Sequence, residues 1–318
     1  MNPNKLGDDI SIMAFDMQPI GPTMAEACKG EALPNDDMVS NRKILIREVV
    51  ISFLQSVSYE PLRIPEALNA IVCSWGVDDG HGGDLFKRVV KISAAMSDLC
   101  YYHHEFNVKL QIALFTWFII YIDDVAAYIP TSLGNFQELM HQRLPQQDPA
   151  LTHFSTLLSD IYLFFEPLCA NFIITSTLEF VSGCALEVRK EVATMPLSLS
   201  ASEWPYFLRA KTGVAAAYGF LIFPKKKHPD MTAYLQAMAD IIFFINVTND
   251  ILFFYKEELA GEERNYIHNR SRVLGEDPGK VLAEVAAEVL ASHHRIIATL
   301  EGEPEALAAW QIFEQGYL

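Results

Sequence analysis

The sequence lacks the features that mark secreted and membrane proteins. Its five cysteines are odd in number and form no CxxC pair, so we expect reduced thiols in an intracellular protein. No basic segment followed by an apolar core opens the chain, so no secretory signal is expected. The longest strongly apolar run, Ile112 to Ile122, is shorter than the roughly 18 residues that a membrane span needs. These absences predict a cytoplasmic protein without a membrane span.

Basic residues are also scarce. The chain has 24 Lys and Arg against 40 Asp and Glu, which gives a net charge of −16. Non-specific nucleic-acid binding needs a basic surface, so we do not expect nucleic acid as a partner. An acidic protein can still hold an anionic substrate where divalent cations or a local basic pocket intervene.

The third absence is that of strand patterns. No sustained two-residue alternation with Asn-Gly or Asp-Gly turns occurs, and no repeat of 20–50 residues is found. From Ser40 onward, apolar residues instead recur at three- and four-residue spacings, which predicts helices. We therefore expect an all-α protein with one helical domain over residues 39–318. Residues 1–38 lack periodicity and are interpreted as an N-terminal arm, either mobile or strapped to the surface.

Two adjacent aspartates follow the most apolar predicted helix, in the segment "YIDDVAAY". Burying the carboxylates of Asp123 and Asp124 beside such a helix is costly unless a cation or a donor meets them. The plainer alternative is that the helix emerges into solvent at this point, and the segment alone leaves both interpretations open.

A second acidic cluster follows another apolar run, in "NVTNDILFFYKEE". Asn249, Phe253 and Glu257 share one helical stripe, with Lys256 within a turn of Glu257. Asn and Glu oxygens suit a hard cation, whereas the phenyl ring between them does not. An amphipathic helix end explains the same residues taken alone.

A basic element, "YFLRAKTG", lies between the two acidic clusters in the sequence. Arg209 suits bidentate phosphate binding and Lys211 adds a compact charge, although an ordinary basic helix start is the common alternative. Together, the three segments suit a deep apolar pocket whose mouth binds Mg²⁺ and, through it, an oligophosphate. The candidate pocket aromatics are Phe115, Trp117, Phe118, Tyr121, Phe180, Phe220 and Phe243.

These segments resemble those of the fungal class I terpene cyclases, in particular the trichodiene-synthase-like family, over about residues 40–318. "YIDDVAAY" resembles the aspartate-rich motif of that family, and "YFLRAKTG" resembles the segment with the diphosphate-sensing arginine. "NDILFFYKEELAGEERNYIHNR" resembles the second metal-binding motif and its downstream stretch. The resemblance implies the class I terpenoid synthase fold, a single helical bundle around a deep apolar pocket. It also implies ionisation of a prenyl diphosphate, usually farnesyl diphosphate, with up to three Mg²⁺ ions and carbocation cyclisation.

The resemblance assigns roles to six residues. The metal ligands are Asp123, assisted by Asp124, and the pair Asn249 and Glu257; the diphosphate contacts are Arg209 and Lys256. Two of the motifs depart from the family pattern. Ala126 and Ala127 stand where a further acid is usual, and Phe253 replaces a Ser or Thr whose hydroxyl ligates the metal. We therefore expect one Mg²⁺ site to be weakened.

Three functions compete at this point. The first is a Mg²⁺-dependent sesquiterpene cyclase. The second is a cyclase-fold enzyme that lets an external nucleophile, such as an amine, capture a terpenyl cation with C–N bond formation. The third is a non-catalytic terpene-binding homologue, which the joint presence of Asp123, Asn249 and Glu257 disfavours. The partners are thus a prenyl diphosphate and, for the second function, a small nucleophile. A homodimer is left open.

Overall fold

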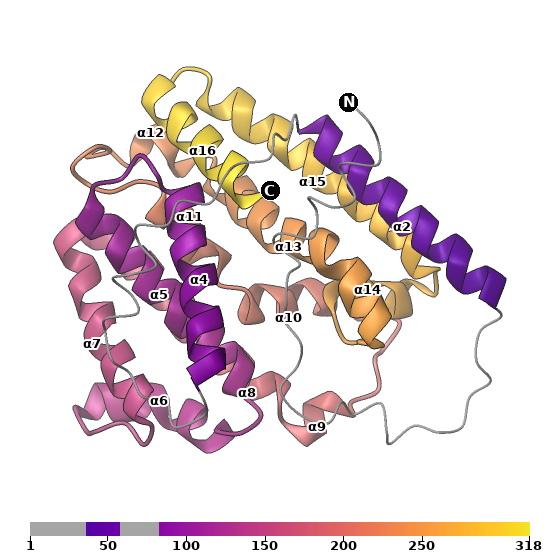
Figure 1. The fold of residues 1–318 in the computed structure, drawn as a ribbon, viewed down its shortest axis with the longest axis horizontal. Coiled ribbons are helices and arrows are strands. Elements are labelled where there is room, and N and C mark those ends of the chain that lie inside the picture. The colour runs from indigo at the N-terminus through magenta and orange to yellow at the C-terminus, as the bar shows by residue number, and fades with distance from the viewer. Residues whose placement is uncertain (1–35, 58–82) are drawn as a thin grey trace. The chain divides into compact units, whose positions relative to one another are not determined.

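The computed structural model describes residues 36–57 and 83–318, and every regular element in these ranges is a helix (Figure 1). This confirms the all-α prediction. The expected arm over residues 1–38 lies outside the described residues except for its last three, where the first described helix already begins at Asp36. The helices are α2 (Asp36–Ser56), α4 (Gly83–Cys100), α5 (Phe106–Val125), α6 (Pro130–Gln142), α7 (Pro149–Phe164), α8 (Pro167–Glu187), α9 (Lys190–Ala193), α10 (Trp204–Thr212), α11 (Ala215–Leu221), α12 (Thr232–Leu235), α13 (Met238–Ala260), α14 (Tyr266–Leu274), α15 (Pro278–Leu300) and α16 (Pro304–Tyr317).

The chain divides into two compact units, each of which is described by itself. The described residues of the smaller unit lie within 36–57, 197–206 and 247–291. Those of the larger unit lie within 83–196, 207–246 and 292–318. Helices α13 and α15 each contribute to both units.

Helix α5 forms the centre of the larger unit. It packs against α4, α7 and α8, while α8 also contacts α6 and α11. Its apolar residues cover all sides of the helix, and most of them are buried. The rings of Phe115 and Phe118 both contact Phe154 of α7, with centroids 6.3 and 5.1 Å apart. These aromatics therefore join helices, and a substrate pocket lined by them stays a prediction.

In the smaller unit, α14 is held between the end of α13 and the first part of α15. Arg270 of α14 donates two hydrogen bonds to Glu288 of α15, at 2.8 and 2.5 Å. The fully buried Phe254 of α13 packs against the ring of His268 of α14, with centroids 5.2 Å apart. Helix α2 runs along α15, where Leu45 lies close to Gly279 (Figure 1).

Helices α8 and α13 are long and apolar enough, by length and composition alone, to cross a membrane. In each of them 56% of the most apolar 18-residue stretch is buried inside the protein. They are core helices, and their apolarity reflects burial in the protein rather than contact with lipid.

Candidate active site

Asp123 and Asp124 occupy the last turn of α5, with Asp123 exposed and Asp124 half-buried. This turn contains no basic residue. Carboxylates at the C-terminal end of a helix face its negative dipole end, so the local potential favours a cation. Asp123 also lies near α8: burial raises the pKa of the Cys184 thiol well above its usual range, and the Asp123 charge raises it further.

The predicted stripe on α13 lies within one continuous helix. Asn249, Phe253 and Glu257 are all half-buried, whereas Ile251 and Phe254 are fully buried. Because the helix is unbroken from 249 to 257, the three stripe residues share one face at successive turns. Asn249 and Glu257 offer oxygen atoms that can ligate a metal ion, and Phe253 between them offers none.

Arg209 is attached to the backbone of α13. Its Nη2 donates to the carbonyl oxygen of Asn246 at 2.8 Å, and Asn246 precedes Asn249 on the same helix by less than one turn. Arg209 stands in the last turn of α10, so the alternative of a basic helix start is wrong: the positive charge lies at the helix end that favours it.

A glycine makes this attachment sterically feasible. Gly213 lies in the break between α10 and α11. A Cβ at Gly213 would lie 2.1 Å from Asn246 Oδ1 and 2.7 Å from Arg209 Nη1. Only glycine permits the backbone to approach these two side chains so closely.

Lys211, the second basic residue of this segment, faces α8. Its Nζ pairs with Glu179 at 2.5 Å and lies 5.8 Å above the centre of the Phe207 ring. It therefore links α10 to α8, while Arg209 lies against α13.

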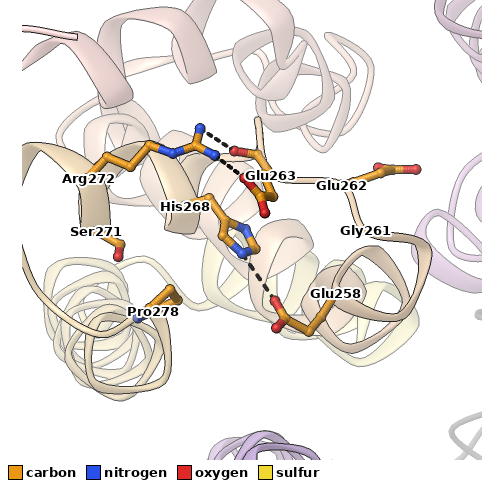
Figure 2. A pocket seen from close by; sticks show the side chains of 8 residues that line it. All are labelled: Glu258, Gly261, Glu262, Glu263, His268, Ser271, Arg272 and Pro278. Atoms are coloured by element: carbon orange, nitrogen blue, oxygen red, sulfur yellow. Dashed lines mark hydrogen bonds and ion pairs between the residues drawn. The ribbon is translucent and has the colours of Figure 1, made fainter. Parts of the chain in front are cut away.

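Two residues that were absent from the sequence-based assignment hold the carboxylates at the end of α13. Asn265 Nδ2 donates to Glu257 Oε2 at 2.7 Å, and His268 Nε2 lies 3.1 Å from Glu258 Oε2. Figure 2 shows the His268 ring directed at Glu258, on the wall of a cavity of about 290 Å³. An Asn directly before a predicted helix is a typical N-cap signal, and this signal could have drawn attention to Asn265.

Comparison with known proteins settles the family. Residues 85–318 match the trichodiene synthase (TRI5) family. The chain is 36% identical over 256 residues to terpene synthase BipA of Cochliobolus sativus, which covers 79% of this chain and 78% of that protein. It is 32% identical over 267 residues to longiborneol synthase CLM1 of Gibberella zeae, covering 82% of this chain and 77% of the relative. The chain belongs to the trichodiene-synthase-like family of fungal terpene synthases.

Solved structures confirm the class I terpene synthase fold. The linalool/nerolidol synthase of Streptomyces clavuligerus matches 81% of this terpene synthase and 97% of its own chain, with a TM-score of 0.61 at 13% identity. The same enzyme in complex with 2-fluorogeranyl diphosphate matches with a TM-score of 0.63 at 12% identity, covering 80% of this chain and 98% of its own. Likeness at this level of identity concerns the fold alone.

Terpene synthases of this family typically depend on Mg²⁺. Within 36–57 and 83–318, no three His, Cys, Asp or Glu side chains form a ready-made metal cluster. The expected ligands still fit Mg²⁺ by type. Asp123 and Glu257 are carboxylates in last turns without a basic residue, and Asn249 adds an amide oxygen. Asp123 belongs to the larger unit, whereas Asn249 and Glu257 belong to the smaller.

Proposed function

We propose that this terpene synthase ionises a prenyl diphosphate, with farnesyl diphosphate as the substrate, and cyclises the resulting carbocation in a Mg²⁺-dependent reaction. One observation supports this above the others. Carboxylate clusters end two apolar helices, α5 and α13, and neither helix has a basic residue in its last turn. Carboxylates at the negative end of a helix dipole favour a bound cation, and such a cation can in turn bind a diphosphate.

Each group has a defined task in this reaction. Asp123, assisted by Asp124, and the pair Asn249 and Glu257 would hold Mg²⁺, which supplies the charge that stabilises the departing diphosphate. Arg209 and Lys256 would contact the diphosphate oxygens. The guanidinium of Arg209 is already fixed by the Asn246 carbonyl, so less side-chain freedom is lost on binding. A carbocation must be kept from water, and apolar helices such as α5 supply surface of that kind.

Phe253 supports a second candidate function. It supplies no ligand between Asn249 and Glu257 and is half-buried, so its ring can shape a pocket wall. An enzyme diverted to capture of a terpenyl cation by an amine could use such a wall to exclude water while admitting the nucleophile. The Phe253→Ser variant should raise Mg²⁺ affinity under either function. In a cyclase, turnover of farnesyl diphosphate should rise with it, whereas in a diverted enzyme the amine-capture reaction should stay unimproved or become worse.

The test is incubation of the protein with farnesyl and geranyl diphosphate, with Mg²⁺ or with EDTA, followed by product analysis and measurement of released diphosphate. A cyclic hydrocarbon formed only with Mg²⁺ supports the cyclase. A product that contains nitrogen, formed only when an amine is supplied, supports the diverted enzyme. Tight binding of either substrate without diphosphate release would show a non-catalytic protein and overturn the proposal.

A further inference from the structure

The end of α13 carries two consecutive carboxylates that the start of α14 holds separately. Glu257 and Glu258 lie in the last turn of α13, and both contact residues of one short segment, Asn265 to His268. All of these residues lie within the smaller unit. A single structural element therefore contacts both carboxylates.

Asn265 is fixed by its role as the N-cap of α14. Its Oδ1 accepts from the backbone N–H of His268 at 2.9 Å and also lies 2.9 Å from His268 Nδ1. A backbone N–H can only donate, so the oxygen of the amide must face His268. The amide nitrogen is consequently turned toward Glu257, and Nδ2 donates to Oε2 at 2.7 Å.

His268 is fixed in turn by three contacts. It is buried, its ring packs on Phe254, and its two nitrogens face Asn265 Oδ1 and Glu258 Oε2. Phe254 and Glu258 are one turn apart on α13, so they hold the ring from one helix face. Figure 2 shows this ring directed at Glu258, and both residues line the same cavity as Ser271 and Pro278.

We propose that Asn265 and His268 are positioning residues that orient the Glu257 carboxylate for Mg²⁺. The inference rests on the proposed function, in which Glu257 is a ligand. A carboxylate at the end of a helix has several rotamers, and only some of them direct an oxygen along the Asn249 stripe. The Asn265 hydrogen bond selects among these rotamers, and the His268 contacts prevent the Asn265 amide from turning over.

The decisive variant is Asn265→Ser. Serine remains a good N-cap, so α14 keeps its start, but it is too short to donate to Glu257. Binding of Mg²⁺ in the presence of inorganic diphosphate is measured by calorimetry. The midpoint temperature of thermal unfolding is measured separately on the metal-free protein. We expect Mg²⁺ affinity to fall by about 10-fold or more, because residues that hydrogen-bond to metal ligands typically contribute about 10–100-fold to metal affinity. The unfolding temperature of the metal-free protein should change little. The activity readout is a raised Mg²⁺ requirement that excess Mg²⁺ relieves.

Two further variants separate the possible failures. His268→Phe keeps the contact with Phe254 and removes both nitrogen contacts, so it should also lower Mg²⁺ affinity. It provides the test of the positioning role if Asn265→Ser does not fold. Glu257→Gln tests the ligand itself, and unchanged Mg²⁺ affinity in this variant would refute the proposed metal role of Glu257. Loss of affinity in Glu257→Gln, with full affinity in both Asn265→Ser and His268→Phe, would overturn the positioning role alone.

Discussion

Replacement of Gly213 by alanine should disrupt the attachment of Arg209 to α13. The added Cβ would lie 2.1 Å from Asn246 Oδ1 and 3.0 Å from the carbonyl oxygen of Arg209 itself. Asn246 is only 2% exposed, so its side chain cannot turn into solvent. The end of α10 must therefore move away from α13, which separates Arg209 Nη2 from the Asn246 carbonyl.

The expected cost follows from two contributions. Overpacking of one methyl group against buried atoms costs about 1–3 kcal/mol. Loss of a hydrogen bond from a charged donor costs roughly 1.5–3 kcal/mol, although movement of α10 relieves part of the overpacking as that bond is lost. We therefore expect the free energy of unfolding to fall by about 2–3 kcal/mol. A strain-free Gly→Ala change would instead stabilise the protein by about 0.4–1 kcal/mol. The sign of the change in unfolding free energy therefore shows whether the added methyl group is strained.

Urea unfolding measures the free energy of unfolding, and inhibition by free diphosphate measures the affinity of the proposed site for diphosphate. Gly213→Ala should both destabilise the protein and weaken inhibition. Gly134→Ala in α6 is the matched control, because its Cβ would meet no atom within 4 Å. In the double variant with Asn246→Ala, which removes the nearest clashing atom, part of the stability should return. Wild-type stability together with unchanged diphosphate inhibition in Gly213→Ala would refute this reasoning.

Three further predictions test the proposed site and the buried histidines. Asp123→Ala or Glu257→Ala should lower turnover of a prenyl diphosphate by orders of magnitude while circular dichroism shows a folded protein, and full activity in either would remove that residue from the metal site. Arg209→Ala should weaken diphosphate inhibition by roughly 1.5–3 kcal/mol, and unchanged inhibition would count against its role. Burial lowers the pKa of His103 to about 4 and of His104 to about 3, so both imidazoles stay neutral in the folded protein while the unfolded chain takes up protons below about pH 6.5. Stability should hence be greatest above pH 6.5 and fall as the pH decreases toward 4. His104 should contribute on the order of 1 kcal/mol to this loss, and His104→Gln should reduce the slope of stability against pH in urea unfolding.

The fold and the family could be predicted from the sequence because both depend on local patterns. The apolar run of α5 and the stripe of α13 each lie within a single helix, where spacing alone determines which residues share a face. The contacts of Arg209 with Asn246 and of Asn265 with Glu257 join different elements, so no spacing rule indicates them. The close approach of α13 to Gly213 is of the same kind, because it brings together residues that lie far apart in the sequence.

The contacts around Glu257 also bear on the meaning of Phe253. Apolar burial already attaches this part of α13 to the protein, because Ile251 and Phe254 are fully buried. Packing therefore does not require the Glu257 carboxylate to be held by Asn265 at 2.7 Å. A purely structural helix end could leave that side chain in water at little cost, whereas a ligand must be oriented before the metal arrives. The contact thus favours a protein that still uses Glu257 to bind a cation, with Phe253 removing one ligand from the stripe and leaving the others in place.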